Sequence, residues 1–163
     1  MRYFRTGIRM GVLLAGALVL TAALLAENQQ LKLNPHLDYN SDRVDGPLVT
    51  GNDTQTGVVA GKPNYVMIYG EGCFNSKRQA RRTVALSKRY QDKVNFVIID
   101  LDKPQSPAQL KLVQSYYEGS IPDLVVLDSN GKAVYNQAGE QTEEVLSHIF
   151  DTLLGDHALQ ERH

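Results

Sequence analysis

The sequence has only one cysteine and no tryptophan in its 163 residues. Because one cysteine cannot form a disulfide within its own chain, Cys73 either stays free or pairs with another molecule. Histidine is also scarce, and its four positions show no metal-ligand spacing: His36, His148, His157 and His163. With one cysteine beside them we expect no zinc site, and nothing in the sequence indicates a cofactor.

An excess of charge of either sign is also lacking. The chain has 17 Lys and Arg against 18 Asp and Glu, a formal net charge of −1. Proteins that bind nucleic acid usually carry a clear basic excess, so we exclude nucleic acid as a partner. With 42% hydrophobic residues, the chain is long enough for one domain with a core and too short for two.

The N-terminus holds the one long run without charge. Three arginines precede this run, which covers 17 residues, 10–26. A cleavable signal has an apolar region of about 7 to 15 residues and a spanning helix needs about 20, so residues 1–26 fit a signal peptide or a signal anchor equally. Because the arginines come first, the remainder should cross the membrane. The predicted location is extracytoplasmic, in the periplasm or cell envelope, either secreted or anchored in the membrane through residues 10–26.

The rest of the chain divides into a polar segment and a series of apolar patterns. Residues 27–59 are rich in Asn, Asp, Gln, Gly and Thr, which predicts a flexible tether with room for one edge strand. The patterns that follow predict a strand at 65–69, a helix at 75–90, a strand at 94–99, a helix from Ser106 to Gly119, a hairpin of 123–127 and 132–136, and a helix after Thr142. The first three of these elements should form a parallel, right-handed strand-helix-strand unit. Residues 155–163 are predicted to be a polar tail.

Some side-chain positions follow from these patterns. Asn130 and Gly131 should supply the positive φ angles of the hairpin turn. The apolar stripe of the helix from Ser106 is expected at Leu110, Val113, Tyr116 and Tyr117. The last helix is expected to turn inward Val145, Leu146, Ile149, Phe150, Leu153 and Leu154.

This order of elements resembles the thioredoxin family over residues 60–154. The matching pieces are Gly61-Lys-Pro63, Tyr69-Gly-Glu-Gly-Cys73, Tyr90-Gln-Asp-Lys-Val94, Asp100-Leu-Asp102, Ser120-Ile-Pro122 and Gly131-Lys132. The resemblance implies an α/β fold, with a three-layer α/β/α arrangement around a central mixed sheet of four to five strands. An N-terminal apolar helix would precede this domain.

The resemblance also implies an active site. Cys73 stands where the family has its attacking cysteine, and Pro122 would be the cis proline that faces it. Ser76 stands where the resolving cysteine belongs, so the motif is Cys-Phe-Asn-Ser. Met67 lies where the family often has a buried aspartate, and Gly72 replaces its usual tryptophan. This is a single-cysteine variant, in which no disulfide can form within the motif.

Other residues should modulate the thiol or contact a substrate. The expected substrate-binding residues are Phe74, Asn75, Ile121 and Gly139. Lys77 and Arg78 lie in the first turn of the helix, where they would favour a Cys73 thiolate, although the helix dipole disfavours cations there. Together with the other cations of this helix they also fit a solvated face, or a surface for an acidic partner or lipid headgroups. Asp123, beside Pro122, would oppose ionisation of the thiol.

Three functions fit these observations. A lone cysteine is commonly a small buried apolar residue, but the turn around Cys73 favours a partly exposed, reactive thiol. The first hypothesis is therefore an enzyme-like protein that forms mixed disulfides through Cys73 with proteins or small thiols, and whose release needs a second thiol. The second is a non-catalytic thioredoxin-fold module that binds or assembles a partner. The third is a monothiol glutaredoxin, since the motif is similar to that family's Cys-Gly-Phe-Ser.

Overall fold

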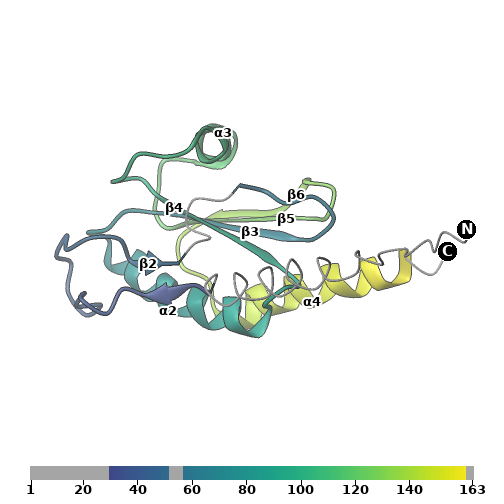
Figure 1. The fold of residues 1–163 in the computed structure, drawn as a ribbon, viewed down its shortest axis with the longest axis horizontal. Helices are drawn as coiled ribbons and strands as arrows, with labels where there is room; N and C mark the ends of the chain where they lie inside the picture. The colour runs from purple at the N-terminus through teal and green to yellow at the C-terminus, as the bar shows by residue number, and fades with distance from the viewer. Residues whose placement is uncertain (1–29, 52–56, 161–163) are drawn as a thin grey trace, which may run out of the picture.

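The central sheet has four strands in the order β4-β3-β5-β6 (Figure 1). The computed structural model describes residues 30–51 and 57–160. The strands are β3 (Asn64–Tyr69), β4 (Asn95–Asp100), β5 (Asp123–Leu127) and β6 (Ala133–Ala138). β3 pairs parallel with β4 and antiparallel with β5, and β5 pairs antiparallel with β6. The sheet is therefore mixed, as predicted.

Three helices cover the two faces of this sheet. They are α2 (Phe74–Arg89), α3 (Pro107–Tyr116) and α4 (Glu143–Gln160). α2 and α4 lie on one face and α3 lies on the other (Figure 1). The three-layer α/β/α arrangement predicted from the sequence is confirmed. The apolar N-terminal segment predicted at residues 1–26 lies outside the described residues, and no helix within them is long and apolar enough to cross a membrane.

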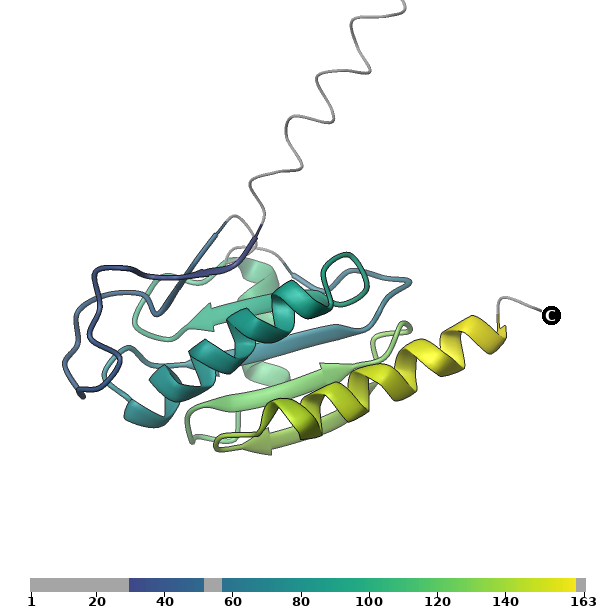
Figure 2. The same cartoon turned by 90° about the horizontal axis from the view of Figure 1, so that it is seen from below.

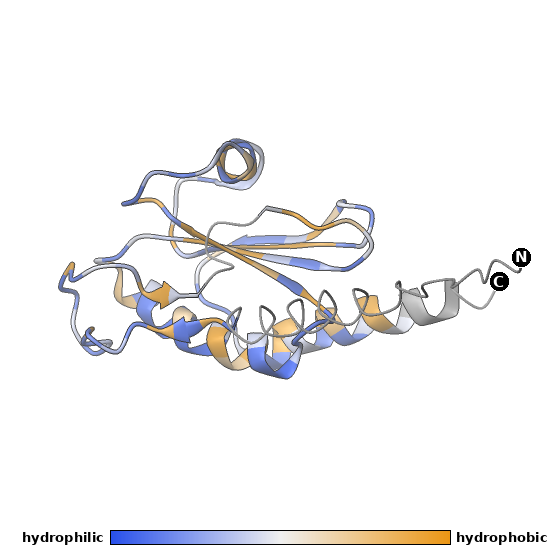
Figure 3. Ribbon diagram, in the orientation of Figure 1, coloured by the Kyte–Doolittle hydropathy of each residue, from blue (hydrophilic) through white to orange (hydrophobic). Residues whose placement is uncertain are grey.

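Alternation along the strands divides the interior into two clusters. In β3, Tyr65, Met67 and Tyr69 face the cluster beneath α2 and α4, whereas Val66 and Ile68 face the cluster beneath α3. Successive residues of a strand point to opposite faces, so a strand covered on both sides must be apolar throughout. Figure 3 shows this as hydrophobic colour along the central strands. The buried sheet thus provides a rigid base for the loops at its ends.

Both predicted helix starts are confirmed, and two predicted inward positions are wrong. Ser106 accepts from the backbone N–H of Gln109 in a capping box, and the Thr142 hydroxyl accepts from Val145 N at 3.3 Å. Leu110, however, is 44% exposed, and Val145 is 41% exposed. In α3 the side-chain amide of Gln109 donates to Ile98 O at 3.2 Å, and this contact turns Leu112 inward in place of Leu110.

The hairpin turn also differs in one detail from the prediction. Only Gly131 adopts a positive φ angle there, at 81°, and Asn130 does not. Instead, the side chain of Asp128 accepts from the backbone N–H groups of Asn130 and Lys132, each at 2.9 Å. The turn is therefore stabilised by hydrogen bonds to Asp128 and needs a positive φ angle only at Gly131.

Residues 30–51, which we call the arm, are packed against the domain where a flexible tether was expected. The arm holds a two-stranded antiparallel sheet of β1 (Lys32–Leu33) and β2 (Val49–Thr50). Its buried residues belong to the same core as α2 and α4: Leu31, Tyr39, Leu48 and Val49. Figure 2 shows the arm running beside α2. At the other end of the chain, α4 continues to Gln160, into the stretch expected to be a polar tail.

If the arm is part of the core, truncating one of its buried side chains should destabilise the whole protein. Leu48 is fully buried, so Leu48→Ala should lower the free energy of unfolding by about 2–5 kcal/mol, as cavity-forming leucine substitutions do. The matched control is Leu110→Ala on the exposed face of α3, which should change stability by less than about 0.5 kcal/mol. Equilibrium urea unfolding of the two variants measures both effects. Equal, small effects would show that the arm does not share the core.

Candidate functional site

Cys73 lies at the N-cap of α2, in the turn that leaves β3. Its backbone is extended, with φ −90° and ψ 117°, as is usual for an N-cap residue. The sulfur accepts from the backbone N–H of Ser76 at 3.5 Å, the role that a Ser or Asp oxygen commonly has at this position. The residue is partly exposed. A sulfur at a helix N-terminus faces unpaired N–H groups and the positive end of the helix dipole, both of which stabilise a thiolate.

A backbone edge lies opposite this sulfur. The Ile121–Pro122 peptide bond is cis, and the Cys73 thiol donates to the carbonyl oxygen of Ile121 at 3.6 Å. The Pro122 carbonyl in turn accepts from Gly139 N at 2.7 Å, and Gly139 has a φ angle of 97°. The structure therefore brings together Cys73, the cis proline and Gly139, which the sequence places in three separate segments.

Ser76 is fully buried one turn along α2, behind the sulfur. Within the described residues its hydroxyl has no hydrogen-bond partner. Helical side chains tilt toward the helix N-terminus, so the Ser76 side chain points back toward the N-cap, where Cys73 lies. A buried hydroxyl without a partner is unfavourable, since it loses its hydrogen bonds to water without replacement.

The rim of the site is held by Arg78. Its guanidinium lies 4.5 Å from the Phe74 ring centroid, donates to Asn75 Oδ1 at 2.7 Å, and pairs with Glu140. This carboxylate holds the pKa of Arg78 above its ordinary value, with a smaller contribution from Cys73. Arg78 in turn lowers the pKa of Glu140. Glu140 was missed by sequence reasoning, because nothing local marks it as the partner of a helix more than fifty residues earlier.

Comparisons with known proteins agree with this geometry. No protein-family profile matches the chain. A "Thiol:disulfide interchange protein TxlA homolog" of Synechocystis sp. is 29% identical over 90% of this chain and 76% of that protein. "Thiol:disulfide interchange protein TxlA" of Synechococcus elongatus is 24% identical over 90% of this chain and 72% of its own length. The solution structure of an uncharacterised thioredoxin-like protein from Clostridium perfringens, 21% identical, covers 58% of this chain and 73% of that one, with a TM-score of 0.50. The chain therefore has a thioredoxin-like fold, and its sequence is similar to those of two proteins named as thiol:disulfide interchange proteins.

Lys77 does not lie on the solvated surface that the charge pattern suggested. The solvated face expected of it is wrong, because Lys77 is fully buried. Its ammonium donates to three carbonyl oxygens of the arm: Asp38 at 3.0 Å, Ser41 at 2.8 Å and Arg43 at 2.8 Å. Three acceptors use all three donors of the ammonium. Lys77 therefore holds the arm, and the carbonyl dipoles offset its unfavourable place in the first helical turn.

Most other cations of α2 also have partners within the chain. Arg81 lies over the Tyr39 ring, at 5.5 Å, and donates to Asn40. Arg82 pairs with Glu140 at 3.0 Å. Arg89 lies over the Tyr90 ring and donates to the Ser147 hydroxyl. These contacts account for the basic composition of the helix without an external acidic partner.

Two other sequence predictions concern residues around the thiol. Asp123 is buried beneath the end of α3, where its Oδ2 accepts from Glu118 N at 3.1 Å. Burial raises its pKa, and its alternation with Val125 and Leu127 places it on the α3 face of the sheet. Met67 is fully buried on the opposite face, where its sulfur accepts from the Thr83 hydroxyl at 3.4 Å. An uncharged methionine with one hydrogen bond to its sulfur thus stands at the position where the thioredoxin family often has a buried aspartate.

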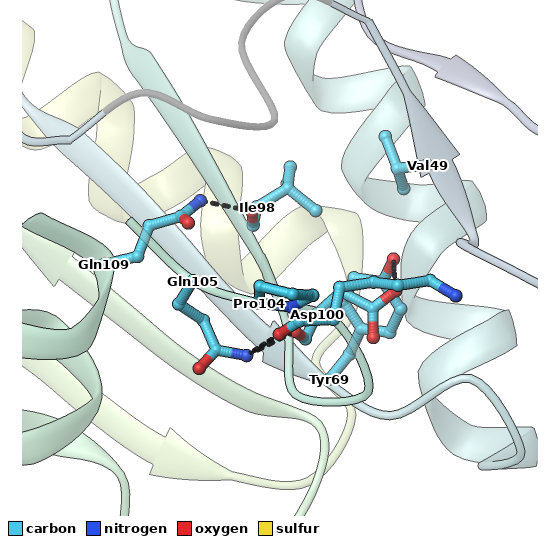
Figure 4. Close-up of a pocket in the computed structure, with 8 residues that line it drawn as sticks. Val49, Tyr69, Ile98, Asp100, Pro104, Gln105 and Gln109 are labelled. Atoms are coloured by element: carbon cyan, nitrogen blue, oxygen red, sulfur yellow. Dashed lines mark hydrogen bonds between the residues drawn. The ribbon is translucent and has the colours of Figure 1, made fainter. Parts of the chain in front are cut away.

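A small pocket lies at the end of β4, and its lining includes both Asp100 and Lys103 (Figure 4). The Asp100 side chain accepts from the Tyr69 hydroxyl at 3.0 Å, and Gln105 donates to its backbone oxygen at 2.8 Å. The pocket has a volume of about 50 Å³. Nearby, the buried Glu71 pairs with Lys103 at 3.0 Å. Burial, and secondarily the Glu71 carboxylate, raise the pKa of Asp100 to about 6.

This raised pKa gives the protein a defined pH dependence. Because the folded state binds the Asp100 proton more tightly than the unfolded state, whose ordinary value is 3.8, this carboxyl stabilises the fold most when protonated. Its contribution to the free energy of unfolding should fall as the pH rises from about 4 to about 7. Asp100→Asn, which keeps the Oδ1 acceptor, should remove this fall. Urea unfolding of both proteins across the window measures the difference, and parallel pH profiles would contradict it.

Proposed function

We propose that this chain carries out thiol-disulfide exchange, forming mixed disulfides through Cys73 with cysteine-bearing proteins or small thiols. The observation that carries the proposal is the partly exposed Cys73 sulfur at the N-cap of α2, where it accepts a helix N–H. The names of its relatives in Synechocystis sp. and Synechococcus elongatus support the same chemistry. The three arginines and the apolar run at residues 10–26 support an extracytoplasmic place of action, secreted or membrane-anchored.

The reaction begins with attack of the Cys73 thiolate on one sulfur of a disulfide. The substrate's S–S bond breaks, a new S–S bond joins Cys73 to one substrate sulfur, and the other sulfur leaves as a thiolate that takes a proton from solvent. The chain has no second cysteine to resolve this species. Release comes from a second thiol. When the substrate's own thiol attacks, Cys73 is regenerated and the substrate disulfide is isomerised without net oxidation or reduction.

Neighbouring groups have separate roles in this reaction. In the resting protein the Ile121 carbonyl oxygen accepts a hydrogen bond from the Cys73 thiol. This hydrogen bond is lost when the thiolate forms. Phe74 and Asn75, which follow Cys73, are exposed and Ile121 is partly exposed, so we expect these residues to contact the substrate. The buried Ser76 hydroxyl has no partner among the described residues, and we expect it to donate to the thiolate once this forms.

The proposal is tested by trapping the mixed disulfide. Full-length wild type, Cys73→Ala and Ser76→Cys are each mixed with a disulfide-scrambled protein, quenched with acid and analysed by non-reducing mass spectrometry. Wild type should accumulate a covalent adduct, and Cys73→Ala should form none. Ser76→Cys supplies the missing resolving thiol, so its adduct should fall by about tenfold or more while an intramolecular disulfide between Cys73 and the introduced thiol appears.

Two outcomes would contradict this proposal. If wild type forms no adduct with any disulfide, Cys73 is not an exchange nucleophile. If Cys73→Ala still captures the same partner without a covalent bond, the chain acts as a non-catalytic binding module, the second function that the sequence left open.

The Ser76 hydroxyl gives a second, independent prediction. Ser76→Ala removes a buried hydroxyl that has no hydrogen-bond partner in the described part of the chain, so the free energy of unfolding should stay the same or rise by up to about 1 kcal/mol. The rate of adduct formation should nevertheless fall by roughly tenfold, the value of one hydrogen bond to a charged group. Urea unfolding and stopped-flow reaction with a small aromatic disulfide separate the two effects. A loss of stability together with an unchanged rate would assign the hydroxyl a structural role.

A further inference from the structure

The arm approaches the reactive turn at Gly72, the residue before Cys73. A Cβ atom added to Gly72 would lie 2.7 Å from Val44 Cγ2 and 3.6 Å from the backbone oxygen of Asp42. Real Cβ atoms do not approach other atoms as closely as 2.7 Å, so the Val44 side chain occupies the space that a side chain at position 72 would need. The absence of a side chain at Gly72 and the position of Val44 depend on each other.

Val44 is also the most exposed large hydrophobic residue within the described residues. It is 67% exposed, although it contacts the turn. Phe74, on the other side of Cys73 in the sequence, is 40% exposed and keeps its place through the Arg78 guanidinium. An apolar side chain in contact with the turn that remains open to solvent is available to a bound molecule. Cys73 is therefore flanked by two exposed apolar side chains: Val44, which lies against Gly72, and Phe74, which follows Cys73 in the sequence.

Val44 is held in place by Lys77. The three carbonyl groups that accept from the Lys77 ammonium belong to Asp38, Ser41 and Arg43, and the last of these directly precedes Val44. If the arm moved away, the buried ammonium would lose all three partners, which is strongly unfavourable. Contacts between Arg81 and the side chains of Tyr39 and Asn40 hold the same segment. A residue fixed in this way can discriminate between substrates, because no ordering of the arm opposes binding.

We propose that Val44 contacts the polypeptide that reacts at Cys73 and favours substrates with an apolar side chain beside the reacting cysteine. Lys77 is the positioning residue for this contact. The inference rests on the proposed exchange function and names its substrate class, a polypeptide disulfide with apolar flanking residues. A small disulfide reaches the sulfur without touching Val44, so its reaction measures the chemistry alone.

The test uses two short peptides that differ only in the residue before their cysteine, leucine or serine, each joined by a disulfide to the same small thiol. Their reaction rates with the full-length protein are compared with the rate for hydroxyethyl disulfide. Wild type should prefer the leucine peptide by about fivefold, as expected for partial burial of one apolar side chain. Val44→Ser should reduce this preference to less than about twofold. Val134→Ser, an exposed valine of β6, is the matched control and should leave it unchanged.

Lys77→Met tests the positioning role. Releasing the arm should abolish the leucine preference although Val44 itself is intact, while the protein still reacts with hydroxyethyl disulfide. If this variant does not fold, the surface variant Val44→Ser still decides the question. Equal rates for the two peptides in wild type, or a preference that survives Val44→Ser, would overturn the inference and leave the exchange function standing. No reaction of wild type with any of the three disulfides would overturn both.

Discussion

A buried ammonium group joins the arm to the helix that carries the thiol. Lys77 is fully inaccessible and is neutralised by backbone dipoles: three carbonyl oxygens within 3.0 Å. Burial of a charge is tolerated only when its hydrogen-bonding capacity is satisfied, so the arm and the first turn of α2 must fold together. The site depends on this interaction, because the same turn of the helix presents Cys73 and the arm closes against the residue before it.

The polar groups of the site lie at the ends of the buried strands and not within them. β3 and β5 are buried on both faces, and the polar groups that matter lie where these strands end or begin. The sulfur, the cis peptide bond and Gly139 come from three different segments, yet the Cys73 thiol donates to Ile121 O and Gly139 N donates to Pro122 O. These contacts hold the turn before α2, the cis peptide bond and the end of β6 against one another.

The strands and helices could be predicted because they follow from local patterns: short apolar runs, a helix without Gly or Pro, and a hydroxyl before each later helix. The mixed sheet and the role expected of Cys73 came from the resemblance to the thioredoxin family. The sequence did not predict the arm, because the anchoring residues Leu31 and Leu48 stand in short apolar pieces without periodicity, within a segment that is otherwise polar. On α3 the sequence predicted Val113, Tyr116 and Tyr117 inward as observed, but placed Leu110 inward wrongly, because Leu112 is turned to the core where Gln109 donates to Ile98 O. The acceptors of Lys77 lie more than thirty residues away and are backbone atoms, which composition cannot reveal.

The buried lysine also changes where the domain should be considered to begin. A fragment starting at residue 60 would retain every strand of the central sheet and would look complete by alignment with smaller relatives. It would leave an ammonium group facing an empty surface, remove the Leu48 backbone N–H that donates to the Tyr69 hydroxyl at 3.1 Å, and uncover one side of the core. The smallest independent folding unit therefore includes the arm, and any transplant of the Cys73 turn into another scaffold would have to carry both segments.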